Sequence, residues 1–226
     1  MLAKLENVTR RYGAKDGVSD LNLSLEAGQA VGLLGLNGSG KTTTLKLLAG
    51  LLYPSQGKVE VVGKLPRDAR GQVAFLSDSD NLYNWLTPAD AERLMRSLYP
   101  DFRPERYKEL LGFLEVPIKP YGAMSKGQKA RLRLAMVLAR EAKLYLLDEP
   151  LGGIDLISRD RIMQTLVREW REDGVIVIST HEVAEAEGIF DRAVFLKEGR
   201  LVLDAMAEDL RQQGKSVKDA FLQVLI

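Results

Sequence analysis

The segment at residues 35–42, Gly-Leu-Asn-Gly-Ser-Gly-Lys-Thr, constrains the fold of this chain more than any other. It follows a continuous apolar run at 30–34 and opens a helical pattern at 41–49. Its glycines carry no side chain, so backbone N–H groups can approach a group that bears several negative oxygens. The helix that follows directs the positive end of its dipole to the same place. The segment therefore predicts a phosphate-binding loop between a buried strand and a helix.

Two side chains of this segment bring chemistry of their own. Lys41 is a mobile cation for the outer phosphates of a nucleoside triphosphate, and the Thr42 hydroxyl is a ligand for Mg²⁺. A glycine-rich structural turn is the alternative, because the pattern also occurs in unrelated proteins. The apolar strand before it and the helix after it favour nucleotide binding.

Three continuous apolar runs indicate a parallel sheet. Residues 30–34, 144–147 and 175–178 have the composition of strands covered on both faces, and helical patterns lie next to each run. We therefore expect an α/β fold. Near the end of the chain, 193–196 and 201–203 flank a glycine-containing turn and predict a hairpin.

Residues from about 79 to 140 have a different pattern. Thr87 and Pro88 are typical of a helix start, and further prolines punctuate the stretch. The apolar stripe of this helix is expected to comprise Ala91, Leu94, Met95 and Leu98. We expect a single domain over 1–226, with a core at 1–78 and 141–204, an inserted helical subdomain at about 79–140 and a short helical tail at 205–226.

A pair of carboxylates ends the second apolar run. Asp148 and Glu149 follow four apolar residues, and an acidic pair at such a point is costly unless a cation accompanies it. Mg²⁺ held near Thr42 would be that cation. Asp148 would then serve the metal, while Glu149 would accept a proton from the attacking water or orient it. A strand-ending turn is the alternative, which the phosphate loop disfavours.

The composition excludes several classes of protein. With 32 basic and 31 acidic side chains the net charge is +1, so there is no global electrostatic support for a nucleic-acid partner. The absence of cysteine excludes a disulfide framework and thiolate metal sites. The apolar runs are too short to cross a bilayer, and the charged N-terminus does not match a signal peptide. We expect a soluble chain that stays where it is made.

These residues resemble the ATP-binding subunit of ABC transporters, along essentially the whole chain. Residues 35–42 match that family's Walker A loop, and 144–149 match its Walker B strand with the catalytic glutamate. The resemblance implies a P-loop NTPase core with a β subdomain and an inserted helical subdomain. It also implies an ATPase whose cofactors are ATP and Mg²⁺.

Four further segments carry the resemblance. Tyr12 occupies the position where the family stacks an aromatic ring on adenine, and 124–128, Met-Ser-Lys-Gly-Gln, resemble its signature Leu-Ser-Gly-Gly-Gln, with methionine and lysine replacing leucine and the first glycine. Residues 152–155 match the D-loop and 179–182 the switch-histidine segment. Taken alone, Tyr12 is more typical of a surface aromatic and His181 of a structural histidine, so both assignments rest on the family position.

The resemblance implies the following site residues. ATP would be bound by Tyr12, Gly35, Leu36, Asn37, Gly38, Ser39, Gly40, Lys41, Thr42 and Thr43. Catalysis would involve Lys41, Glu149 and His181. Mg²⁺ would be held by Thr42 and Asp148, with Asp78 as a further candidate. The ATP of a partner would be contacted by Ser125, Lys126, Gly127 and Gln128, and Asp155 would belong to the D-loop.

The residues around the signature support an anion site independently. Ser125 and Gln128 form a capping box at a helix start, yet four basic side chains crowd residues 126–133, where the helix dipole disfavours cations. An anion that arrives from outside would resolve this conflict. A solvated basic helix face is the alternative.

The sequence departs from the family at the Q-loop. Asp78 replaces the glutamine that reaches the metal and the attacking water and links the ATP site to the membrane partner. An aspartate still offers an oxygen to Mg²⁺ but is shorter and charged, so we expect coupling or the hydrolysis rate to differ. A plain acidic turn at 77–81 is the alternative.

The family resemblance also implies partners. The chain would form a head-to-tail dimer with a second nucleotide-binding subunit, identical or a paralogue, and would act on an integral membrane transporter subunit. The helical lobe with Tyr83 and Trp85 would contact that subunit. No nucleic-acid partner is expected, and the chain would be cytoplasmic, at the inner face of the cell membrane. The stretch at 78–83 and the compact length are similar to bacterial exporter-type stand-alone ATPases.

Two other functions stay open at this point. A soluble ABC-type ATPase that acts on ribosomes or DNA usually carries two cassettes or a long coiled coil, and neither is present in this sequence. A regulatory module that holds ATP without turnover is disfavoured by Glu149 and His181.

Overall fold

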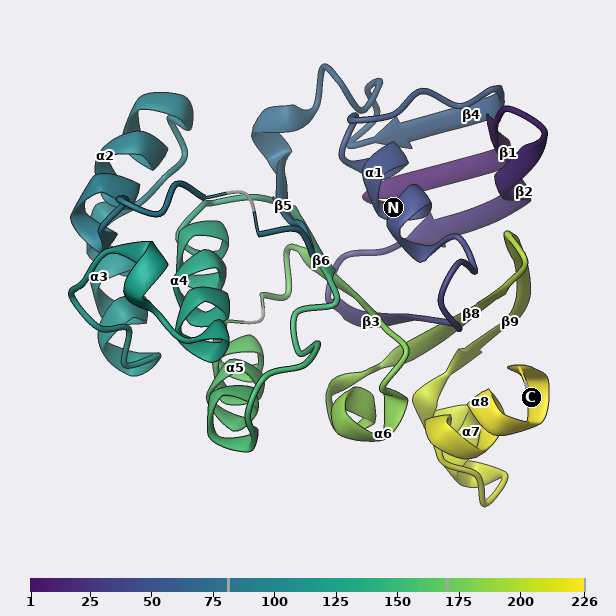
Figure 1. Ribbon diagram of the computed structural model, residues 1–226. Helices are drawn as coiled ribbons and strands as arrows, with labels where there is room; N and C mark the ends of the chain where they lie inside the picture. Colours follow the sequence, from purple (N-terminus) through teal and green to yellow (C-terminus); the bar gives the residue numbers. More distant parts are fainter. Residues whose placement is uncertain (81, 170, 226) are drawn as a thin grey trace.

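The computed structural model describes residues 1–80, 82–169 and 171–225, which form two sheets (Figure 1). Asn81, the last residue of the acidic turn considered above, lies outside the described residues. The smaller sheet is antiparallel and has the order β2 (Lys15–Leu25), β1 (Ala3–Tyr12), β4 (Gln56–Val61). The larger sheet has the order β5 (Val73–Leu76), β6 (Leu144–Asp148), β7 (Val175–Thr180), β3 (Gln29–Leu34), β8 (Arg192–Lys197), β9 (Arg200–Met206).

The larger sheet is parallel except for its edge strand β9, which pairs antiparallel with β8. The predicted α/β fold is therefore confirmed. The predicted hairpin is confirmed as β8 and β9, and its turn residues Glu198 and Gly199 have φ of 50° and 80°. Positive φ at both central residues gives a turn whose twist matches that of the flanking strands.

Alternate residues of the central strands face opposite sides of the larger sheet. In β6, Leu144 and Leu146 belong to the apolar cluster that includes the small sheet and α1 (Lys41–Leu48). Tyr145 and Leu147 belong to the other cluster, which includes the helical lobe. Because both faces are covered, the strand has a continuous apolar sequence. Burying one such leucine contributes about 1.5–3 kcal/mol.

Apart from α1, which lies beside the small sheet, the helices lie in two groups (Figure 1). Helices α2 (Pro88–Leu98), α3 (Pro104–Phe113) and α4 (Lys126–Leu138) gather on the side away from the small sheet, and α5 (Leu156–Glu169) packs against α3 and α4. The short helices α6 (Val183–Ala186), α7 (Ala207–Gln212) and α8 (Val217–Leu225) lie near β8 and β9. The 3₁₀ turns are η1 (Arg70–Gln72), η2 (Tyr121–Ala123) and η3 (Glu187–Ile189).

Helix α2 begins where the sequence predicts, but part of its expected apolar stripe is exposed. The Thr87 side chain accepts from the Asp90 backbone N–H at 3.2 Å, and the Asp90 carboxylate accepts from the Thr87 N–H at 2.9 Å, a complete capping box. Of the stripe, Leu94 and Leu98 are 37% and 59% exposed. The α2 surface therefore presents apolar area to solvent.

The helical tail begins later than the sequence analysis expects. Ala205 and Met206 belong to β9, where they pair with Ala193 and Arg192. The β8–β9 ladder extends the hairpin by these residues, and α7 starts at Ala207. Among the described residues, no helix has the length and apolar character needed to span a membrane.

Candidate nucleotide site

Four parallel strands of the larger sheet end at the same edge. The loops that leave β5, β6, β7 and β3 begin there, because parallel strands share one direction. The glycine-rich loop follows β3, and Asp148 is the last residue of β6. Asp78 follows β5 and His181 follows β7. The sheet topology thus gathers residues that are far apart in the sequence.

The glycine-rich loop forms an open cradle. An added Cβ at Gly35 would collide with the Leu196 carbonyl and the Ser39 side chain, so only glycine fits. Gly38 faces open space with a φ of 80°, and Gly40 precedes α1 with a φ of 106°. The buried Ser39 hydroxyl has no hydrogen-bond partner among the described residues. This unpartnered polar atom fits a loop that accommodates the oxygens of a phosphate.

Lys41 is held inside this cradle. Its side chain is only 6% exposed, and its ammonium donates to the Gly35 carbonyl at 2.7 Å and to the Leu36 carbonyl at 3.3 Å. The Glu149 carboxylate lies 3.4 Å away. A buried ammonium needs such partners, because an unpaired charge away from water is costly. The lysine is therefore preorganised next to the loop.

Asp148 is buried behind the loop. Its Oδ1 atom accepts from the Thr42 hydroxyl at 3.1 Å and from the Ser179 hydroxyl at 2.6 Å. Burial raises the pKa of Asp148, whereas the hydrogen bonds from Ser179 and Thr42 lower it. A carboxylate and a hydroxyl in contact are the oxygen ligands that suit Mg²⁺. Ser179 is a contributor that the sequence analysis did not single out.

Glu149 has an unusual backbone conformation. Its φ is 47°, and its N–H donates to the Ser179 carbonyl and hydroxyl, both at 3.1 Å. Its Oε1 atom lies 3.0 Å from His181 Nδ1, while the buried Oε2 atom has no partner among the described residues. Non-glycine residues in this region are strained by about 1–3 kcal/mol, and such strain clusters at functional sites.

The glycine-rich loop, Lys41 and Glu149 line a cavity of about 360 Å³. Its walls include Tyr12, Asn37, Thr43, Asp78 and Glu149. All five are site residues that the sequence predicts. Lys15, Asp16 and Gly17 of β2 form a further wall that the sequence does not predict, because nothing in their local pattern indicates which surface they face.

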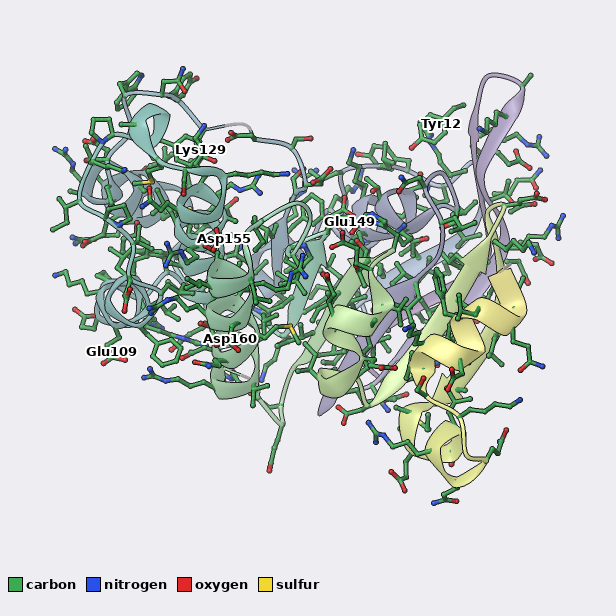
Figure 2. All side chains as sticks on the ribbon, turned by 60° about the horizontal axis from the view of Figure 1, so that its bottom comes forward. Tyr12, Glu109, Lys129, Glu149, Asp155 and Asp160 are labelled. Carbon is green, nitrogen blue, oxygen red and sulfur yellow. The ribbon has the colours of Figure 1, made fainter. Side chains whose placement is uncertain are left out.

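Tyr12 lines this cavity and is the last residue of β1. Its side chain is 47% exposed, and the Arg10 guanidinium lies 5.1 Å from the ring centroid. The ring packs against Gly17, where an added Cβ would come within 2.6 Å of it. Figure 2 shows Tyr12 and Glu149 on the same side of the molecule. A half-exposed aromatic ring in the wall of the cavity can stack on a base.

Asp78 lines the phosphate cavity and also a second cavity of about 260 Å³, which lies towards α4. Lys126 and Lys129 form part of the second cavity. The Arg133 guanidinium donates to the carbonyls of Asp78 at 3.4 Å and Ser79 at 2.7 Å. The Q-loop position is therefore attached to α4 through its backbone.

The signature residues form the start of α4. Ser125 is the N-cap, and its hydroxyl accepts from the Gln128 N–H at 3.3 Å while the Gln128 side chain accepts from the Ser125 N–H at 3.0 Å. An added Cβ at Gly127 would come within 2.6 Å of the Asp155 carboxylate. The Lys126 ammonium lies against Gly153, whose φ of 61° favours glycine. The signature and the D-loop therefore pack on each other within one chain.

Among the described residues, no group of three His, Cys, Asp or Glu side chains is arranged to hold a metal ion by itself. Mg²⁺ in nucleotide sites uses one or two protein oxygens, and phosphates and water complete its octahedron. Thr42 and Asp148 fit that donor set, since their oxygens are already 3.1 Å apart.

Comparisons with known proteins agree with this geometry. Residues 18–152 match the model of the ABC transporter family. The chain is 35% identical to the aliphatic sulfonates import ATP-binding protein SsuB 2 of Pseudomonas aeruginosa, over 93% of this chain and 77% of that protein. It is 31% identical to the SkfA peptide export ATP-binding protein SkfE of Bacillus subtilis, over 96% and 95% of the two chains.

Solved structures give the same result. An ATP-binding subunit of an ABC transporter superimposes with a TM-score of 0.87 and 27% identity, and the match covers 99% of both chains. A dimeric ATP-binding cassette in a post-hydrolysis state with ADP and Pi gives a TM-score of 0.80 and 26% identity, over 91% of this chain and 98% of the other. The chain therefore belongs to the ABC transporter family, as an ATP-binding subunit that hydrolyses ATP.

Proposed function

We propose that this chain closes head-to-tail with a second nucleotide-binding subunit, an identical copy or a paralogue, around two MgATP. The proposal rests on one observation, which is that the phosphate cavity and the signature residues of the same chain are separate. The phosphate cavity is lined by the loop, Asp78 and Glu149, whereas Ser125 and Gln128 are not among its described lining residues. Because the signature residues do not line the phosphate cavity of their own chain, they are available to bind the ATP phosphates held by a partner chain.

The geometry supports distinct roles within each ATP site. Lys41 binds the outer phosphates, and Thr42 and Asp148 would hold Mg²⁺, which would neutralise phosphate charge. Glu149 takes a proton from the attacking water, for which its unpartnered Oε2 atom is suited. His181 Nδ1 lies 3.0 Å from Glu149 Oε1 and orients that carboxylate, and a ring that carries protons on both nitrogens also donates from Nε2 to the γ-phosphate.

The helical subdomain at about 79–140 is the proposed contact with the membrane subunit. Tyr83 and Trp85 are 67% and 64% exposed, and their rings stack with centroids 5.6 Å apart. A groove of about 350 Å³ lies nearby, and Phe75, Leu82 and Met95 contribute apolar walls to it. Exposed aromatic residues beside an apolar groove are typical of protein contact surfaces. This contact would keep the chain at the cytoplasmic face of the membrane.

A Glu149→Gln variant tests the dimer. It should still bind ATP and accumulate as a dimer with ATP and Mg²⁺, because the base is lost while the binding groups remain. Light scattering with ATP and Mg²⁺, and with EDTA in place of Mg²⁺, measures the assembly. A variant that binds ATP and stays monomeric, or wild-type turnover in that variant, would contradict the proposal.

A Trp85→Ala variant tests the membrane contact. It should lose co-purification with the membrane fraction and keep its basal ATPase rate. Tyr53→Ala is a matched control, because Tyr53 is 63% exposed but lies outside the helical subdomain. Equal membrane association of both variants would exclude the proposed contact.

A further inference from the structure

The Asp80 side chain contacts one residue that precedes the signature (residues 124–128) and one residue that follows it. Its Oδ1 atom accepts a hydrogen bond from the buried Tyr121 hydroxyl, and its Oδ2 atom pairs with the Lys129 ammonium at 3.1 Å. Tyr121 opens η2, four residues before Ser125, and Lys129 lies four residues after it on α4. One carboxylate therefore holds the chain on each side of the signature N-cap.

The Tyr121 and Lys129 side chains also contact each other. The Lys129 ammonium lies 4.7 Å from the centroid of the Tyr121 ring. Tyr121 is only 1% exposed, and its backbone N–H donates to the Leu86 carbonyl at 2.8 Å. The carboxylate of Asp80, the phenol and the ammonium thus form a closed set of contacts, which we name the Asp80 clamp (Asp80, Tyr121 and Lys129). A closed network of this kind restrains each member more than one contact would.

The charges of the clamp are matched. Lys129 lies in the first turn of α4, where the helix dipole disfavours a cation, and Asp80 compensates it. Burial tends to raise the pKa of Asp80, but the hydrogen bonds from Tyr121 and Lys129 outweigh it, and the pKa is lowered. Asp80 is therefore ionised at neutral pH, and the ion pair with Lys129 is present under working conditions.

The chain just before Asp80 lies at the phosphate cavity. Asp78 lies two residues before Asp80 and lines that cavity together with Lys41 and Glu149. Arg133, on the same face of α4 as Lys129, holds the carbonyls of Asp78 and Ser79. Residues 78–80 are therefore fastened to α4 at several points, and Asp78 at their start lines the phosphate cavity.

We propose that Asp80 couples the two ATP sites of the dimer. The coupling rests on the proposed head-to-tail arrangement, in which the phosphate cavity of one chain serves one ATP and its signature serves the other. A displacement of Asp78 by the first ATP is transmitted by the Asp80 clamp to the segment that carries Ser125. Asp80 is a positioning residue, since it contacts neither ATP.

The test compares three variants in ATPase assays over a range of ATP concentrations. Asp80→Asn removes the charge, and Tyr121→Phe removes only the hydroxyl. Tyr107→Phe is the matched control, because the buried Tyr107 hydroxyl donates to the Pro88 carbonyl at 3.0 Å in the same lobe and touches none of residues 78–80. The Hill coefficient should fall towards unity in the first two variants and stay at the wild-type value in the control.

Binding and assembly are measured beside turnover. ATP affinity of the monomer should stay within about twofold of wild type in all three variants, since the phosphate cavity keeps its groups. A wild-type Hill coefficient in both Asp80→Asn and Tyr121→Phe would overturn the inference. Failure of Glu149→Gln to form a dimer with ATP would instead overturn the proposed function, so the two failures are distinct.

Discussion

The Glu149 carboxylate lies 3.4 Å from the Lys41 ammonium, so the proposed catalytic base is paired with the cation of the phosphate loop. Both side chains are largely buried, at 14% and 6% exposure, and solvent screens such a pair only weakly. The same carboxylate oxygen contacts His181. A change at any one of these three side chains therefore alters the electrostatic environment of the other two.

Replacement of Lys41 by alanine should abolish measurable ATP binding. The variant loses the cation for the outer phosphates and leaves Glu149 without its buried partner, which adds repulsion between that carboxylate and the phosphates. Isothermal titration calorimetry measures the affinity. Lys46→Ala is the control, because Lys46 is on the same helix but does not line the phosphate cavity. Wild-type affinity in Lys41→Ala would contradict the phosphate-loop assignment.

Replacement of His181 by alanine should reduce kcat by about 10²-fold or more, with ATP affinity of the monomer nearly unchanged. His181 contacts Glu149 at 3.0 Å but is not among the described residues that line the phosphate cavity, so its contribution is expected at the chemical step. Single-turnover hydrolysis separates this step from binding. A variant with normal kcat and weak ATP binding would assign His181 to ground-state binding instead.

Replacement of Tyr12 by alanine should weaken ATP binding, whereas Tyr12→Phe should retain it. Stacking of a base on an aromatic ring is worth about 1–3 kcal/mol by alanine substitution, or roughly 5- to 150-fold in affinity. The phenylalanine ring keeps this surface, and the Tyr12 hydroxyl makes no hydrogen bond to any of the described residues. Equal affinities of the alanine variant and wild type, measured by fluorescence titration, would remove Tyr12 from the site.

The sequence predicts the parts of this site that depend on local pattern. The loop at 35–42, the carboxylates after β6 and the Ser125 capping box all follow from spacing within a few residues. The contact of Ser179 with Asp148 spans 31 positions in the sequence, and that of Tyr121 with Asp80 spans 41. Such contacts depend on the strand order and on how the helices dock, and the local periodicity of a single sequence does not reveal either.

Local pattern also leaves open the burial of one helix face and the position of one element boundary. Leu94 and Leu98 have the spacing of a buried stripe, but periodicity alone does not tell whether another element covers that stripe. Ala205 and Met206 follow a strand and precede a helix, and their side chains fit either element. Pairing with β8 decides in favour of the strand, because tertiary hydrogen bonds override weak local propensity.

Replacement of Asp78 by glutamine should change turnover or its response to the membrane partner. The glutamine side chain is longer and neutral, so it keeps an oxygen for the phosphate cavity and removes a negative charge that faces Asp148. Steady-state ATPase assays with and without the membrane subunit provide the measurement. Unchanged rates in both conditions would favour a plain acidic turn.

Replacement of Gly127 by alanine should impair assembly of the dimer without weakening ATP binding to the monomer. The added Cβ would come within 2.6 Å of the Asp155 carboxylate and would also meet Ser158, so the signature and the D-loop cannot keep their mutual packing. Gly112→Ala is the matched control, because nothing lies within 4 Å of an added Cβ there, and alanine should stabilise α3 by about 0.4–1 kcal/mol. Thermal unfolding verifies that both variants fold, and light scattering with ATP in a Glu149→Gln background measures the dimer. If Gly127→Ala assembles as well as Gly112→Ala, the packing of Gly127 on Asp155 does not shape the surface that meets the partner.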